Sequence, residues 1–206
     1  MLEKLPDAVG HALHHVRAGL DQIAFNLVAL RTGMAALQLR SLAFADHAPI
    51  PALYTADGEG ISPPLQWTGV PAGAASLLLI VEDADAPAPH PLVHAIVFDL
   101  PAQDGALVDN AMADPALKTG RNSYLQTGWL PPDPPPGHGV HRYVFELFAL
   151  AAGPAFSATP GRDEVIQALH ERAMASGLLT GTYERPDGLI KLGVKQREPA
   201  LKQLAT

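Results

Sequence analysis

The sequence predicts a mainly β fold that is rich in loops, and three observations favour it over a helical bundle. The 206 residues include 18 glycines and 20 prolines, which mark turns and interrupt helices. Residues 141–150 place side chains alternately on two faces, as a strand does. Residues 77–81 are an unbroken aliphatic run, typical of a strand covered on both faces. A hydrophobic content of 48% is enough for a sizeable core.

The first 40 residues differ from the rest and predict one amphipathic helix. Pro6 followed by Asp7 is a favourable helix start. From Leu13 to Leu37 the apolar residues recur at steps of three and four, which is a heptad pattern. Because the following domain looks complete without it, we expect residues 1–40 to form an extension that mediates self-association, and therefore a homodimer.

Three histidines on this expected helix have a spacing that metal sites use. His11, His14 and His15 would share one helix face, with only Asp7 as a nearby acid. Motif signals of this kind are weak, so we favour the interpretation of exposed or interface histidines.

The stretch from residue 41 to residue 100 predicts several strands joined by turns. Phe44 opens a probable strand, residues 57–60 form a turn, and Leu65 alternates with Trp67 in the next strand.

An acidic segment follows the aliphatic strand. Three carboxylates fall within residues 82–85, and a second apolar strand over residues 93–98 returns in the antiparallel sense. That return brings His94 close to the acidic residues. The segment is either a pocket rim, in which Asp83 and Asp85 share one face, or a solvated turn that ends a strand.

The second half of the chain predicts a long loop, a strand, a helix and a last strand. Residues 102–139 are rich in Gly, Pro, Asn and Asp, and a loop of this length is usually functional or poorly ordered. Thr159 and Pro160 begin the helix and Gly177 ends it. Residues 178–183 form the last strand, and the tail after it holds a possible short strand at 189–194.

Composition excludes several classes of function. A formal net charge of −7 repels nucleic acid and anionic membranes. The absence of cysteine excludes disulfides, thiolate catalysis and cysteine-ligated zinc. Charged residues interrupt every apolar stretch near the N-terminus, so we expect neither a membrane span nor a secretory signal, and a cytoplasmic location.

Several motifs occur in one order with consistent spacing. They are Ser62-Pro63-Pro64-Leu65 with Trp67, Asp83-Ala84-Asp85-Ala86-Pro87, His94, Gly137-His138-Gly139, His141-Arg142-Tyr143 with Phe145, and Leu179 to Tyr183. Together they resemble the phosphatidylethanolamine-binding protein family, in its bacterial branch of Raf-kinase-inhibitor-like proteins (the YbhB/YbcL type). The resemblance covers about residues 42–185. We therefore divide the chain into an extension (1–40), a β domain (41–185) and a tail (186–206).

The resemblance implies a Greek-key, antiparallel β-sandwich with a few peripheral helices and a small anion-binding pocket at one end. It also implies a non-catalytic protein without a cofactor, which binds phosphate or a phospholipid headgroup and regulates a kinase or protease. The residues that it assigns to the pocket are Asp83, Asp85, Pro87, His94, Asp133, Pro135, His141 and Tyr143.

This sequence departs from the family pattern at the pocket. Ala84 replaces a proline, and Asp133 replaces a cysteine and adds negative charge near an anion site.

The residue chemistry is consistent with a binder. A carboxylate partner raises the pKa of a histidine, so Asp83 and Asp85 would orient His94 and His141 to hold an anion with outward N–H groups. The alternative is a metal-dependent hydrolase that uses the same Asp and His cluster.

Overall fold

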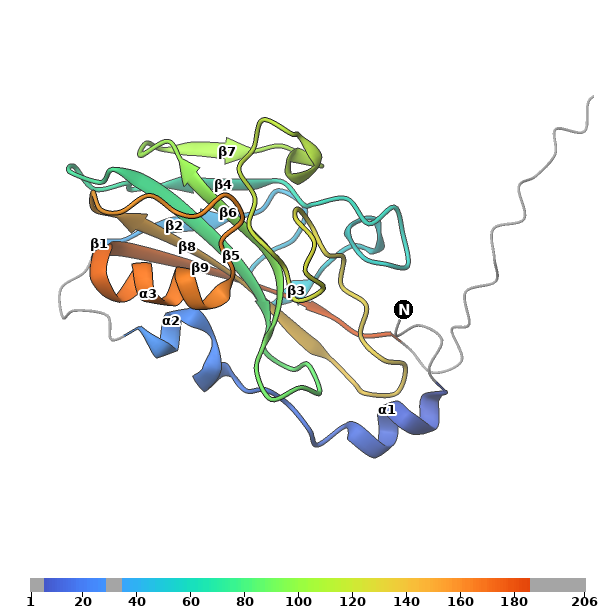
Figure 1. The fold of residues 1–206 in the computed structure, drawn as a ribbon. Helices are drawn as coiled ribbons and strands as arrows, with labels where there is room; N and C mark the ends of the chain where they lie inside the picture. The colour runs from blue at the N-terminus through green and yellow to red at the C-terminus, as the bar shows by residue number, and fades with distance from the viewer. Residues whose placement is uncertain (1–5, 29–34, 186–206) are drawn as a thin grey trace, which may run out of the picture.

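The computed structural model describes residues 6–28 and 35–185, which form two packed β-sheets with short helices outside them. The larger sheet has the order β1 (Ala35–Ala36), β9 (Ala173–Tyr183), β8 (His141–Leu150), β5 (Ser76–Asp83) and β6 (Leu92–Leu100), with β3 (Ala48–Pro49) also beside β9. The smaller sheet has the order β2 (Gln38–Arg40), β4 (Leu65–Thr68) and β7 (Gly105–Leu107). In Figure 1 the smaller sheet lies above the larger one.

The central strands β5, β6, β8 and β9 pair in the antiparallel sense, whereas the short strands β1 and β3 pair parallel to β9. The predicted mainly β sandwich is therefore confirmed.

Strand β5 is buried on both faces, as its unbroken aliphatic run predicts. Leu77, Leu79 and Val81 belong to the core between the sheets. Leu78 and Ile80 face the opposite side and pack with residues of helix α3 (Arg162–Arg172). Every side chain from Leu77 to Val81 is at most 1% exposed.

Helix α3 is shorter than the sequence suggests. Its N-cap is Gly161, so Thr159 and Pro160 lie before it, and it ends at Arg172. Gly177 does not end the helix but lies within β9, where a Cβ atom would stand 2.5 Å from the carbonyl oxygen of Leu37. Glycine is needed there because a neighbouring backbone passes too close for a side chain.

The prediction of one long N-terminal helix is wrong. The segment forms α1 (Asp7–Leu13), the 3-10 turn η2 (Leu20–Gln22) and α2 (Ala24–Leu27), and residues 35–40 contribute strands. Gly19 has φ 96°, which interrupts any continuous helix. The amides of Ala18 and Gly19 instead donate to the carbonyl oxygens of Ala86 and Ala84 in the acidic segment. Leu30 and Met34 of the heptad pattern lie outside the described residues.

Some apolar residues of the extension pack on their own domain, whereas Leu20 and Leu27 are 38% and 36% exposed. Ile23 and Val28 are 2% and 4% exposed, whereas Val16 of the same pattern is 46% exposed. The extension therefore has no continuous helical face that could form a dimer interface. The expected homodimer stays a prediction. The three histidines share no helix face either, because α1 ends at Leu13.

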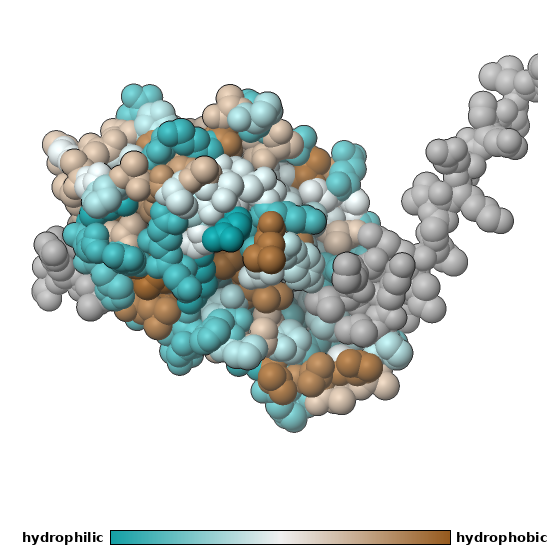
Figure 2. Space-filling model, viewed as in Figure 1, coloured by the Kyte–Doolittle hydropathy of each residue, from teal (hydrophilic) through white to brown (hydrophobic). Residues whose placement is uncertain are grey.

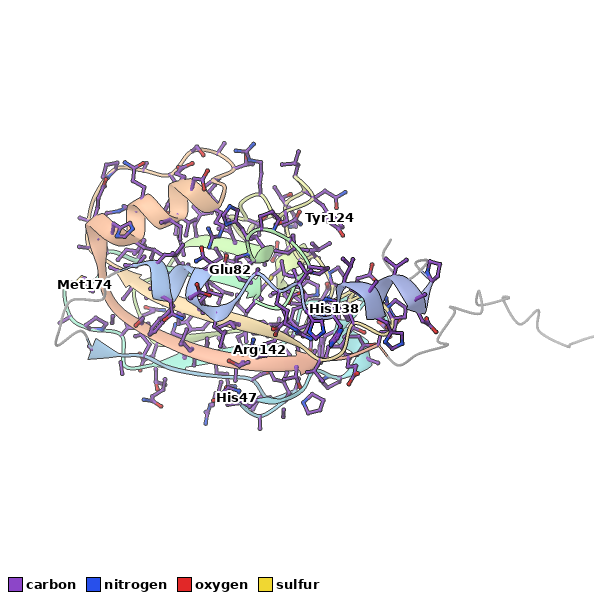
Figure 3. All side chains as sticks on the ribbon, turned by 90° about the horizontal axis from the view of Figure 1, so that it is seen from below. His47, Glu82, Tyr124, His138, Arg142 and Met174 are labelled. Atoms are coloured by element: carbon purple, nitrogen blue, oxygen red, sulfur yellow. The ribbon has the colours of Figure 1, made fainter. Side chains whose placement is uncertain are left out.

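Two buried glutamates hold α2 in place. Glu82 Oε2 accepts the amide of Ala24 at 2.6 Å, and Glu146 Oε2 accepts the amide of Phe25 at 2.6 Å. Burial, and then the charge of Glu82, raise the pKa of Glu146 well above its ordinary value, which favours the protonated form of this side chain. Glu82, which is labelled in Figure 3, also forms an ion pair with Arg162 at 2.6 Å, and this pair links α3 to the same glutamate.

The remaining connections are largely loops. Phe44 lies in a loop and packs in the core with Phe145, and the 102–139 segment contains only β7 and the 3-10 turn η4 (Ala111–Ala113) as regular elements. A further 3-10 turn, η3, spans Ala52–Tyr54. The possible strand at 189–194 lies outside the described residues. None of the helices in the described ranges is long and apolar enough to span a membrane. Hydrophilic and hydrophobic residues are mixed over the face in Figure 2, with hydrophobic residues along α1.

We expect the extension to contribute to stability through its buried side chains. Substituting Ile23→Ala should lower the free energy of unfolding by about 2–5 kcal/mol, because it leaves a cavity under α2. Urea denaturation measures this change. The control is Leu42→Ala, since Leu42 is 73% exposed and its loss should change stability by less than about 0.5 kcal/mol. Equal effects of the two substitutions would show that the extension is not docked in solution.

Candidate functional site

A small pocket lies where the ends of β5, β6 and β8 meet the proline-rich loop. Its cavity volume is about 20 Å³, which is room for roughly one water-sized group. The lining residues are Asp83, Ala86, Pro87, Leu92, His94, Tyr124, Leu130, Pro131, Asp133, Pro134, Pro135 and His141. The antiparallel pairing of the strands therefore brings together motifs that are far apart in the sequence.

Most of the residues assigned by sequence lie in this wall. Those that line the cavity are Asp83, Pro87, His94, Asp133, Pro135 and His141. Asp85 and Tyr143 do not line it, and each has a different role.

Asp83 orients His141, as the sequence predicts. Their registers place them on adjacent strands, and His141 Nδ1 lies 2.8 Å from Asp83 Oδ2. The other carboxylate oxygen, Oδ1, accepts the amide of Asp85 at 2.9 Å. Both side chains are buried, so the pair is held rigidly.

The second nitrogen of His141 does not point to the cavity. His141 Nε2 lies 2.7 Å from His138 Nδ1, and His138 Nε2 lies 2.9 Å from the carbonyl oxygen of Leu13 in α1. His138 is labelled in Figure 3. The expectation that His141 offers an outward N–H to a ligand is therefore wrong, because the relay from Asp83 to Leu13 uses both of its nitrogens.

The relay is the chain of hydrogen bonds from Asp83 through His141 and His138 to the carbonyl oxygen of Leu13, and it needs three hydrogens when all its bonds are made. A carboxylate and a carbonyl oxygen only accept, so one hydrogen lies on His141 Nδ1, one on His138 Nε2 and one between the two rings. The imidazole pair then carries one positive charge, which Asp83 balances. Burial, followed by the charge of His141, lowers the pKa of His138, so the third proton is the one that leaves as the pH rises.

His94 has no carboxylate partner, contrary to the prediction. Its Nδ1 lies 2.7 Å from the carbonyl oxygen of Leu130. Its Nε2 is buried and has no hydrogen-bond partner. Burial lowers the pKa of His94 and outweighs the opposing effect of the Asp83 charge, so the ring is neutral at pH 7.

Tyr143 lies behind the pocket wall. Its ring contacts the His94 ring edge-on at a centroid distance of 5.0 Å. Its hydroxyl is buried without a partner, and burial followed by the charge of Asp83 raises its pKa well above the ordinary value. Tyr143 therefore stays protonated, and its ring packs edge-on against the ring of His94.

Asp85 faces away from the cavity. Its carboxylate accepts Arg142 Nε at 2.7 Å and Arg142 Nη2 at 2.7 Å, and Arg17 Nη1 lies 3.0 Å from it. Burial alone would raise its pKa, but the bonds from Arg142 and Arg17 outweigh burial and lower it. The prediction that Asp85 orients a histidine is wrong, because two guanidinium groups compete for this carboxylate and bind it more strongly.

The extra carboxylate of Asp133 has a buried cation beside it. Arg185 Nη1 lies 2.8 Å from Asp133, Arg185 Nη2 lies 2.9 Å from Asp57, and the Arg185 side chain is 0% exposed. The negative charge of Asp133 is thus balanced within the protein.

The sequence did not identify three supporting residues. His138 of the proline-rich loop contacts His141. Arg17 of the extension contacts Asp85, which lies outside the cavity lining, and Arg185, which follows β9, contacts Asp133. The Gly-His-Gly motif was a usable signal for His138. Arg17 and Arg185 carry no local signal, because their partners lie 68 and 52 or more positions away, at Asp85 and at Asp133.

In the described ranges, no group of three or more His, Asp and Glu side chains is arranged to hold a metal ion.

Comparison with known proteins gives a consistent result. The family model described as "Phosphatidylethanolamine-binding protein" matches residues 40–184. A UPF0098 protein of Aquifex aeolicus is 34% identical over 81% of this chain and 99% of its own length, and one of Methanothermobacter thermautotrophicus is 36% identical over 72% and 99%.

Two solved structures are also similar to this chain. One is CT736 of Chlamydia trachomatis, a putative phosphatidylethanolamine-binding protein homolog with 36% identity, a TM-score of 0.67 and coverage of 73% and 98%. The other is E. coli YbcL, described as a member of the mammalian PEBP family, with 26% identity, a TM-score of 0.67 and coverage of 73% and 99%.

We expect Arg185 to be essential for stability. Substituting Arg185→Met leaves Asp57 and Asp133 without their shared cation in a mostly buried site, which should cost about 3–5 kcal/mol of unfolding free energy. The matched control is Lys118→Met, which breaks the exposed ion pair with Asp99 and should cost less than about 1 kcal/mol. Urea denaturation compares the two, and equal costs would contradict the role given to Arg185.

Stability should also fall in mild acid. The pKa values of His94 and His138 are lowered from 6.5 in the folded protein. As the pH falls, the unfolded chain therefore takes up these protons before the folded protein does, and the free energy of unfolding begins to decrease below about pH 6.5. Below that pH each histidine contributes a loss of up to about 1.4 kcal/mol per pH unit. Urea denaturation of the wild type and of His94→Gln at pH 7.5 and at pH 5.5 measures the free energy of unfolding at each pH. We expect this free energy to fall less between the two pH values in the variant than in the wild type. The exposed control His90→Gln should keep the wild-type loss, and an unchanged loss in His94→Gln would contradict a buried neutral ring.

Proposed function

Because the chain belongs to the phosphatidylethanolamine-binding protein family, we propose that it is a non-catalytic binding protein whose pocket accepts the tip of a small oxyanion, such as phosphate or a phosphate-bearing headgroup. The observation that carries this proposal is the buried Nε2 of His94, which has no partner and stands in the wall of the cavity. An unsatisfied buried polar atom costs about 1–3 kcal/mol. A ligand oxygen that bonds to Nε2, with the shared hydrogen carried either by the ring or by the ligand, recovers this energy.

The surroundings of the cavity support binding rather than bond cleavage. The His141 nitrogens and the Asp83 oxygens already have partners within the protein. Neither residue is therefore poised to activate a water or a hydroxyl group. No observation on the described residues favours the metal-dependent hydrolase alternative.

The cations near the pocket are used to balance carboxylates. Arg142 and Arg17 neutralise Asp85, and Arg185 lies between Asp57 and Asp133. These pairs lower the electrostatic cost of bringing an anion to an acid-rich site. Regulation of a kinase or protease stays a prediction, since no residue described above defines a partner.

The proposal is tested by calorimetric titration of the full-length protein with inorganic phosphate at pH 7.5. We expect saturable binding in the wild type and a loss of at least tenfold in affinity for His94→Ala, because the ligand loses a buried hydrogen bond. The control His90→Ala changes an exposed histidine outside the pocket and should bind as the wild type does. Absence of phosphate binding, or equal binding in His94→Ala, would overturn the proposal.

A further inference from the structure

The extension holds both loops that form the pocket wall, although it does not line the cavity itself. Within the described ranges, the lining residues all come from residues 83–141. The bonds of the extension end on the segment after β5 and on the last part of the proline-rich loop. Figure 1 shows the extension passing below the loop between β5 and β6. The extension therefore acts on a ligand through the position of these loops.

The segment after β5 is bonded to the extension through its backbone. The amide of Gly19 donates to the carbonyl oxygen of Ala84 at 2.8 Å, and the amide of Ala18 donates to the carbonyl oxygen of Ala86 at 3.0 Å. Ala86 and the next residue, Pro87, line the cavity. These two bonds fix the backbone of one pocket wall.

Arg17 joins this segment to the other wall. Its Nη1 lies 3.0 Å from Asp85 Oδ1 and donates to the carbonyl oxygen of Val140 at 2.8 Å. Its Nη2 donates to the carbonyl oxygen of His138 at 3.1 Å. The amide of His138 in turn donates to the carbonyl oxygen of Pro135, which lines the cavity. One guanidinium group thus connects two loops that are far apart in the sequence.

Helix α1 packs directly against the proline-rich loop. Gly10 is buried, and a Cβ atom at this position would overlap the carbonyl oxygen of Pro136. The carbonyl oxygen of Leu13 lies 2.9 Å from His138 Nε2. Because the two backbones pass so close together, a larger residue in place of Gly10 displaces α1 from the loop.

We propose that the extension is a positioning element of the ligand site and that Arg17 is its positioning residue, so that docking of the extension and binding of the oxyanion strengthen each other. This inference rests on the proposed function and concerns the regulation of that same site. Only the docked extension holds both walls in place around His94, so the ligand binds the docked form more tightly. Linkage then requires the ligand to favour docking by the same factor.

The first test is calorimetric titration of the full-length protein with inorganic phosphate at pH 7.5. Gly10→Ala keeps every charge and raises the intrinsic helix propensity of α1, but it displaces α1 from Pro136. We expect the phosphate affinity of this variant to fall by at least about fivefold, the lower end of typical coupling between sites. The control Ala8→Ser adds one atom at an exposed position of the same helix and should bind as the wild type does.

The outcomes of this titration separate the two proposals. Phosphate binding that is equally tight in the wild type and in Gly10→Ala would overturn this inference and leave the proposed function standing. Absence of phosphate binding to the wild type would overturn the proposed function, and this inference with it.

Substitutions of Arg17 test the assignment to this residue. Asp85 keeps both of its side-chain bonds from Arg142, so no buried carboxylate loses its only cation. We expect Arg17→Gln to lower phosphate affinity by at least about fivefold. Arg17→Lys should recover part of this loss, because an ammonium group pairs with Asp85 but lacks the fork that reaches both loops. The control Arg40→Gln makes the same change of charge on β2, and equal affinities of Arg17→Gln and Arg40→Gln would overturn the role of Arg17.

Hydrogen exchange of the wild type measures the reciprocal effect. The amides of Ala18 and Gly19 exchange when their bonds to the acidic segment open, so their rates report the docking of the extension. At a phosphate concentration ten times Kd, we expect these rates to fall by up to about tenfold. The amide of Ala75, which donates to Leu150 at the opposite end of β5 and β8, should slow less. Unchanged rates at Ala18 and Gly19, or equal slowing at all three amides, would overturn the coupling.

Discussion

The burial of carboxylates in the central strands and directly after β5 is the constraint on which the rest of this structure depends. Glu82, Asp83, Asp85 and Glu146 are each at most 3% exposed. A buried charge is very costly unless it is paired or neutralised. Each of these groups therefore specifies a partner: a histidine for Asp83, guanidinium groups for Asp85 and Glu82, and a retained proton for Glu146.

These partners join the extension and the pocket into one structural unit. The extension donates backbone amides to Ala84 and Ala86, supplies Arg17 to Asp85 and accepts His138 at Leu13. Every one of these bonds ends on a residue in or directly behind the pocket wall. The matched family region begins at residue 40, so in this chain a segment outside that region helps to position the pocket loops.

The strand assignments succeeded where one-dimensional patterns correspond to burial. The run 77–81 lies in β5 and residues 141–150 form β8. The unbroken aliphatic run of β5 matches a strand that is covered on both faces. Strand β8 is also buried at every position but Arg142, so there the alternation indicated a strand but not which faces are covered. The helix that the heptad pattern predicted for the extension does not form as one element. The spacing shows which residues are apolar, but it does not show which surface covers those residues. Ile23 and Val28 are covered by the β domain of the same chain, and Gly19 turns the chain out of a helix.

The sequence alone determined the mainly β architecture and the acidic segment after β5, because strand periodicity and antiparallel return are properties of short stretches. The grouping of Asp83, His94, Asp133 and His141 was expected only from the family resemblance, and these four residues line one cavity. Only the tertiary structure decided which way each polar side chain points: Asp85 to Arg142, His141 to His138, and His94 to the carbonyl of Leu130. Those choices depend on partners from distant segments that compete for the same buried group, and the outcome is set by geometry in three dimensions.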